Sequence, residues 1–109
     1  MTKVQVDGKE FVELTSTGSI TLIRTYSAGV HFGTLFSQMG KEVVLKNARR
    51  LWSWTGACSL HQVAIDGVNL SDSRISVVVP EITLTEAIEI IPMSESAGNT
   101  MMGAKAWKK

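Results

Sequence analysis

The first half of the chain alternates apolar and polar residues in short runs that are typical of β-strands. Residues 18–26 are rich in β-branched and aromatic side chains. Because successive side chains of a strand point to opposite faces, this segment would place four alternate side chains on one face: Ile20, Leu22, Arg24 and Tyr26. The pattern predicts a strand.

Turn residues separate this strand from its expected neighbours. The Asp7-Gly8 dipeptide lies between the runs 3–6 and 10–14, and it accepts the positive φ angles of a tight hairpin turn. Residues 27–36 contain two glycines four apart and fit either a strand with close backbone approach or a loop, and we favour a pair of strands broken near Gly29. These segments therefore predict antiparallel hairpins.

The following segment leads into a run that is rich in arginine and tryptophan. Met39-Gly40-Lys41 predicts a turn before a strand over residues 42–45, and Lys46-Asn47 predicts a bend leading into residues 48–56. Because the expected strands follow one another directly, the pattern predicts a β-meander.

The apolar residues change to a helical period after Trp54. Ser59 and Gln62 have the spacing of a capping box, and apolar residues then recur at i, i+3 and i+4. Gly67 stands where a left-handed residue would end the helix. We therefore expect a helix over residues 60–66.

Two prolines predict the ends of strands in the last third of the chain. After a polar loop at residues 69–73, the β-branched run 74–79 is expected to stop at Pro80, because proline cannot donate to an interior ladder. Residues 82–91 fit a strand or a helix. Their isoleucine and threonine content favours one strand that ends at Pro92.

The residues beyond Pro92 are mostly Ser, Gly, Met and Lys, which predicts a loosely ordered tail over residues 93–109 with at most one helical turn after Ser94. Trp107 is the exception, because so large an apolar ring is expected to pack against the rest of the domain.

Together the elements predict a single mainly β (α+β) domain over residues 1–109. It would be a small antiparallel sheet or a barrel-like β domain with one short helix.

The length and composition fit one domain in a reducing cytoplasm. The 109 residues include one cysteine, Cys58, which excludes an intrachain disulfide, and residues 1–20 lack a signal-peptide pattern. Polar and charged residues interrupt every apolar run, so no membrane span is expected.

Opposite charges gather in the two halves of the chain, although the net charge is only +1. Residues 16–60 carry a net charge of +4, and residues 61–104 carry −5. This asymmetry indicates either a basic binding face or oppositely charged surfaces that meet in a homo-oligomer, and strands whose charges mix on one surface would also produce it. A pI of 7.9 lacks the basic excess of a general nucleic-acid binder.

Residues 47–56 are the strongest candidate for a binding site. In an extended segment, Arg50, Trp52 and Trp54 would project from one face, placing a guanidinium beside two indoles. Arginine pairs with phosphate and indoles stack on bases, so this surface suits a planar anion. The alternative is a core strand whose tryptophans pack under a neighbouring sheet. Nearby candidates for the same ligand-binding surface are Arg49, Arg24 and Tyr26.

Other polar groups offer weaker candidates. The helix capped by Ser59 could attract an anion at its N-terminus, or the serine could simply satisfy its own N–H groups. Cys58 and His61 have the spacing of half a zinc site, and His31 alone cannot complete it. We therefore predict no metal and no cofactor, and we expect Cys58 to be a buried structural cysteine.

Catalytic chemistry finds no support in the sequence. Cys58 and His61 could touch on one helix, but no orienting group or oxyanion-binding feature accompanies them. Glu86 and Glu89 would point to opposite faces of a strand, so they would not form an acid–base pair. We predict that the protein is not an enzyme.

Three motifs resemble a family of small proteins encoded by tailed bacteriophages. They are RTYSAGV at residues 24–30, NARRLWSWTGA at 47–57 and LTEAIEIIP at 84–92. The similarity covers the chain from about residue 20 onward. It implies a phage protein in the host bacterial cytoplasm or in the virion, and it assigns no catalytic or binding residue.

We therefore expect a non-enzymatic phage accessory protein that forms a β-rich homo-oligomer and binds an anionic aromatic, nucleotide-like ligand. Sequestration of a nucleotide used in host immune signalling fits this chemistry. One alternative is a virion structural or assembly protein that forms homo-oligomers. The other is an inhibitor that binds a host protein or nucleic acid.

Overall fold

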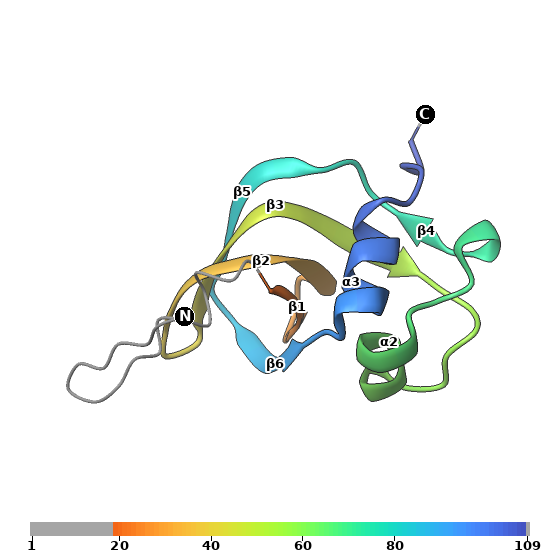
Figure 1. Cartoon of the computed structure of the whole chain (residues 1–109). Helices are drawn as coiled ribbons and strands as arrows, with labels where there is room; N and C mark the ends of the chain where they lie inside the picture. Colours follow the sequence, from red (N-terminus) through yellow and green to blue (C-terminus); the bar gives the residue numbers. More distant parts are fainter. Residues whose placement is uncertain (1–18, 109) are drawn as a thin grey trace, which may run out of the picture.

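The computed structural model describes residues 19–108, which form an antiparallel sheet with helices packed against it (Figure 1). The mainly β prediction is confirmed. The hairpin expected over residues 3–14 lies outside the described residues. Within these, the strands are β1 (Ile20–Thr25), β2 (Val30–Met39), β3 (Glu42–Ser53), β4 (Arg74–Ile75), β5 (Val79–Leu84) and β6 (Ala87–Pro92), and the helices are α2 (Leu60–Asp66), α3 (Glu95–Met102) and the short 3₁₀ turn η1 (Leu70–Asp72).

The sheet is curled, because β5 and β6 follow one another in the chain but lie at its opposite edges. Its order is β4-β3-β2-β1-β6, and β5 pairs with the same side of β3 as β4. Only Thr85 and Glu86 connect β5 to β6, so the two edges must approach at this end (Figure 1). A hydrogen bond of 3.0 Å from Ala87 N to Lys41 O holds the start of β6 against the turn between β2 and β3.

A bulge in β3 helps the sheet to bend. The bend expected at Lys46-Asn47 does not interrupt the strand, and β3 instead carries an extra residue there, with Asn47 at φ 52°. Gly33 lies opposite on β2. A Cβ on Gly33 would lie 3.0 Å from both Ala48 Cα and Lys46 O, so only glycine allows the two backbones to approach this closely.

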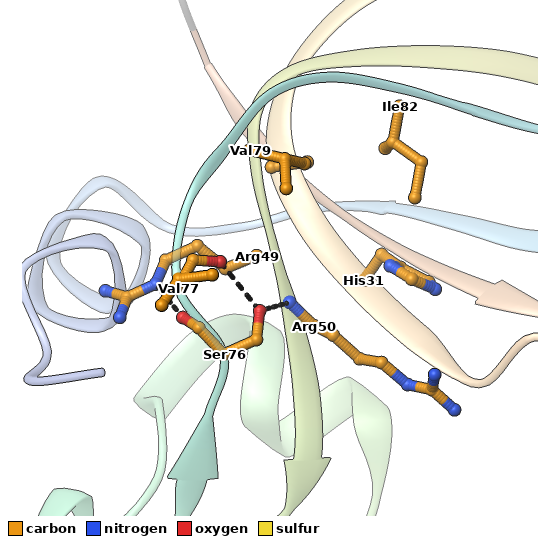
Figure 2. Close-up of a pocket in the computed structure, with 8 residues that line it drawn as sticks. His31, Arg49, Arg50, Ser76, Val77, Val79 and Ile82 are labelled. Carbon is orange, nitrogen blue, oxygen red and sulfur yellow. Dashed lines mark hydrogen bonds between the residues drawn. The ribbon is translucent and has the colours of Figure 1, made fainter. Parts of the chain in front are cut away.

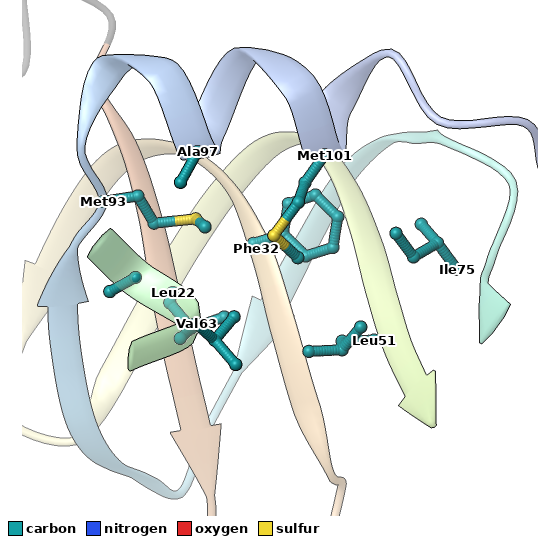
Figure 3. Close-up of a cluster of buried hydrophobic side chains, with 9 residues drawn as sticks. Leu22, Phe32, Leu51, Val63, Ile75, Met93, Ala97 and Met101 are labelled. Carbon is teal, nitrogen blue, oxygen red and sulfur yellow. The ribbon is translucent and has the colours of Figure 1, made fainter. Parts of the chain in front are cut away.

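Each face of the sheet carries a buried apolar cluster. Leu22 and Ile23 are consecutive in β1 and fully buried, one in each cluster. Figure 3 shows Met101 of α3 beside the Phe32 ring, in the cluster between the sheet and the helices. That cluster consists of Leu22, Phe32, Leu51, Val63, Ala64, Ile75, Met93, Ala97 and Met101, and the cluster on the other face consists of Ile23, Val43, Leu45, Ala48, Leu84 and Ala87.

The structure corrects the expected strands of the last third. The strand predicted over residues 74–79 is interrupted after Ile75, and β5 runs through Pro80. Proline is tolerated there because β5 is an edge strand that pairs with β3 alone. The single strand expected over residues 82–91 is two strands, β5 and β6, and the second ends at Pro92 as predicted.

Helix α2 spans residues 60–66 as predicted. Ser59 Oγ accepts a hydrogen bond from Gln62 N, and Gly67 ends the helix at φ 78°. In place of a second bond to Ser59, Gln62 Oε1 accepts from Cys58 N at 3.0 Å.

The expectation of a loose tail after residue 93 is wrong for residues 95–102. These form α3, with Ser94 as its N-cap. A Cβ on Gly98 would lie 2.9 Å from Ile20 Cβ, so glycine lets the helix pack closely on β1. The small residues that suggested disorder therefore permit helix packing.

Candidate functional site

Arg50 and Trp52 lie together on one face at the C-terminal end of β3, as the sequence predicted. The Arg50 guanidinium carbon is 4.2 Å from the centroid of the Trp52 ring, a cation–π contact. Gly29 makes room for this arrangement, since a Cβ there would lie 2.8 Å from an Nη atom of Arg50. The positive φ of Gly29, 84°, places the β1–β2 turn beside the guanidinium.

The C-terminal segment and β4 extend this pair into a stack of four side chains. The Trp107 ring stacks on Trp52 with centroids 6.2 Å apart and an interplanar angle of 21°. The Arg74 guanidinium carbon lies 5.1 Å from the centroid of Trp107. A hydrogen bond of 2.8 Å from Trp107 N to Ile75 O fixes the segment to β4. We call Arg50, Trp52, Trp107 and Arg74 the arginine-tryptophan ladder.

The tryptophans of the ladder are accessible, and its two guanidinium groups have no described hydrogen-bond or ion-pair partner. Trp52 is 50% exposed and Trp107 is 45% exposed. Among the described residues, neither the Arg50 nor the Arg74 guanidinium makes a hydrogen bond or an ion pair, so their N–H groups are available. The ladder therefore offers two positive charges held over indole rings at the surface.

Trp54 does not join this surface, so the prediction that it would project with Arg50 and Trp52 is wrong. Opposite β4, β3 carries an extra residue between Leu51 and Ser53, and this second bulge reverses the alternation of side chains. Trp54 consequently packs against the helix-side cluster that contains Leu51, and its Nε1 donates to Ala57 O at 3.3 Å.

Arg49 has a structural role, because its guanidinium is engaged by backbone carbonyl groups. It is 3% exposed and points toward α3, away from Arg50 (Figure 2). Burial lowers the pKa of its guanidinium. Its donors reach four carbonyl oxygens: Ser76 at 2.8 Å, Met101 at 3.3 Å, Met102 at 2.8 Å and Ala104 at 2.7 Å. Arg49 therefore caps the C-terminus of α3 and ties it to the segment after β4.

Arg24 and Tyr26 make no described contact with the ladder. Arg24 forms an ion pair of 3.6 Å with Glu89 of β6, and Tyr26 is 78% exposed in the β1–β2 turn. The ladder instead includes Arg74 and Trp107, which the sequence did not assign to this site. The one signal for them was the expectation that the Trp107 ring would dock.

A cavity of about 230 Å³ lies next to the ladder, between β2, β3 and the segment that joins β4 to β5 (Figure 2). His31 on its wall is 5% exposed, and its Nε2 lies 2.9 Å from Ala28 O. Burial is the main cause that lowers the pKa of His31. Nearby Arg50 acts in the same direction, and the Ala28 hydrogen bond opposes both. The cavity is lined by His31, Ala48, Arg49, Arg50, Ser76, Val77, Val79 and Ile82.

Cys58 and Glu86, two weaker candidates from the sequence, lie away from the ladder and have local hydrogen-bond partners. Cys58 is exposed, which corrects the expectation of a buried cysteine, and its Sγ contacts Gln62 Oε1 at 3.2 Å. Glu86 accepts from Ser27 Oγ. Between residues 19 and 108, no three His, Cys, Asp or Glu side chains gather as a metal site would require, and no helix has the length and apolar character needed to span a membrane.

A family model described as a domain of unknown function (DUF6948) matches residues 18–101. The chain belongs to the DUF6948 family. The part that matches this DUF6948 model contains Arg50, Trp52 and Arg74, whereas Trp107 lies beyond it. No curated protein and no solved structure shows significant similarity to the chain.

Proposed function

We propose that the protein binds a phosphate-bearing aromatic ligand of the nucleotide class at the arginine-tryptophan ladder, without catalysing a reaction. The supporting observation is the pair of guanidinium groups, Arg50 and Arg74, that lie over the rings of half-exposed indoles with no anionic partner among residues 19–108. Phosphate oxygens match the fork of N–H donors on each guanidinium.

The contacts of Arg50 prepare its cation for binding an anion. A free arginine side chain loses rotamer entropy when it binds, whereas Arg50 is already held between Gly29 and Trp52. Each guanidinium contacts an indole ring, and its N–H donors have no described partner among residues 19–108. The ladder therefore suits one ligand with extended negative charge or two phosphate groups.

The test is a calorimetric titration with linear and cyclic nucleotides. Removing one charge-assisted contact costs about 1.5–3 kcal/mol, so Arg50→Ala and Arg74→Ala should each weaken binding about tenfold to hundredfold. Arg24→Ala is the matched control, because Arg24 is exposed but paired with Glu89. An equal loss in all three variants, or the absence of binding to the wild-type chain, would contradict the proposal.

We also propose a phage setting, in which the protein sequesters a signalling nucleotide of host immunity. The support is the resemblance of the motifs at residues 24–30, 47–57 and 84–92 to a tailed-phage family. Mass spectrometry of small molecules released from protein purified from infected bacteria tests it. The wild-type chain should carry a nucleotide that Arg50→Ala lacks, and equal amounts in both would refute this setting.

Self-association is a second candidate function, favoured by the edge strand β6. Among the described strands, β6 pairs with β1 alone, and Ile88 is 44% exposed on it. A second copy could pair with this edge, as in a homo-oligomeric assembly protein. Light scattering should then show a wild-type oligomer that Ile88→Lys dissociates and Val78→Lys does not. A monomeric wild-type chain would exclude this candidate.

A further inference from the structure

The cavity beside Arg50 has an apolar wall with one well-defined polar feature. Val77, Val79 and Ile82 contribute apolar side chains to its lining (Figure 2). The Ser76 hydroxyl is already engaged, since it donates to Val77 O and accepts from Arg50 N, both at 2.8 Å. The Arg49 guanidinium is turned toward α3. The interior therefore suits a flat apolar group, and His31 is left to provide polar recognition.

His31 presents a buried acceptor that has no partner among residues 19–108. A carbonyl oxygen can only accept, so the nitrogen near Ala28 O, Nε2, must carry the proton. In the neutral ring, Nδ1 is then an acceptor, and no described group donates to it. An unsatisfied buried acceptor is unfavourable, so a ligand with an N–H or O–H donor would gain from filling the cavity.

Arg50 connects this cavity to the ladder. His31 and Arg50 are direct cross-strand partners on β2 and β3, so their side chains share a face. Figure 2 shows the Arg50 side chain extending past His31, away from Val77 and Ser76. A ligand with its ring against His31 would therefore need a linker to bring its anionic group to the guanidinium. A nucleotide has this arrangement, with a sugar between base and phosphate.

We propose that the cavity binds the base of a nucleotide, with a base N–H group donating to His31 Nδ1 and the phosphate contacting Arg50. The proposal rests on the proposed function for its phosphate half only. An apolar ring without a donor would leave Nδ1 unsatisfied, and ribose 5-phosphate would leave the cavity unfilled. Both should bind more weakly than a nucleotide.

Adjacent valines provide a matched test of the base site. Val77 and Val78 are 43% and 45% exposed, but only Val77 lines the cavity. In titrations with the 5′-monophosphates of adenosine, guanosine, cytidine and uridine, Val77→Phe should weaken binding of the preferred nucleotide by about tenfold or more through overpacking. Val78→Phe should leave the affinity within about twofold, as expected of an exposed position away from the cavity. Equal effects of the two substitutions would overturn the base site.

Nitrogen NMR of His31 provides a readout that does not depend on a variant. The preferred monophosphate should shift the Nδ1 resonance, because a new hydrogen bond forms there, and ribose 5-phosphate should not. If none of the four monophosphates shifts Nδ1, the base site is wrong.

The two proposals fail in distinguishable ways. If Arg50→Ala weakens nucleotide binding and Val77→Phe does not, the ladder function stands and the base site is overturned. If only Val77→Phe weakens it, the base site stands and the ladder function is overturned. Absence of binding by all four monophosphates overturns the base site, and absence of binding by the cyclic and other linear nucleotides as well overturns the ladder function.

Discussion

Replacing Arg49 by methionine should destabilise the protein far more than replacing its neighbour Arg50. Arg49 is 3% exposed and donates to four carbonyl oxygens, three of them on the segment from Met101 to Ala104. Methionine keeps most of the apolar stem but leaves these acceptors, and Ser76 O, without their donor. Breaking a buried charged network of this kind costs about 3–5 kcal/mol.

Arg50→Met is the matched control for this prediction. The Arg50 side chain makes a cation–π contact with Trp52 and no described hydrogen bond, so its loss should cost about 0.5–1 kcal/mol. Urea denaturation gives both free energies of unfolding, and hydrogen exchange of the α3 amides should accelerate in Arg49→Met alone. Equal destabilisation by the two substitutions, or unchanged protection of α3, would refute the capping role of Arg49.

Two further predictions concern the sheet and the buried histidine. Gly33→Ala should lower the free energy of unfolding by about 1–3 kcal/mol, because the added Cβ would lie 3.0 Å from the β3 backbone. Gly103→Ala is the control, because its Cβ would make only ordinary contacts of 3.5 Å or more and should change stability little. Equal urea midpoints for the two variants would contradict this prediction. Because burial lowers the pKa of His31 below its usual 6.5, the unfolded chain takes up a proton more readily than the folded chain below that pH. The His31 contribution to stability is therefore complete above pH 6.5 and is lost as the pH falls toward the lowered folded pKa. His31→Phe should reduce this pH dependence of the unfolding free energy, and an identical dependence in both proteins would refute the assignment.

Local sequence signals predicted the elements that are governed by local chemistry. Ser59 and Gly67 predicted the two ends of α2, and the β-branched residues of the segment 20–25 predicted β1. The pairing of Arg50 with Trp52 also followed from simple alternation along a strand. These features depend on neighbours within a few residues, so a single sequence is sufficient to predict them.

Features that depend on distant pairing could not be predicted in this way. The position of Trp54 depends on a bulge in β3 that is defined only by its pairing with β4. Pro80 lies in a strand because that strand is at the edge of the sheet. The stacking of Trp107 on Trp52 joins residues from two distant parts of the chain. Half of the ladder was therefore missed, although each of its residues is visible in the sequence.

The three tryptophans allow the central claim to be tested in one titration. The chain contains only Trp52, Trp54 and Trp107, so incorporation of 5-fluorotryptophan gives three ¹⁹F signals, with Trp54 as an internal control. During titration with a nucleoside monophosphate, the signals of Trp52 and Trp107 should shift together with one common affinity, and the Trp54 signal should stay in place. A shift confined to Trp54, or no shift at all, would contradict binding at the ladder.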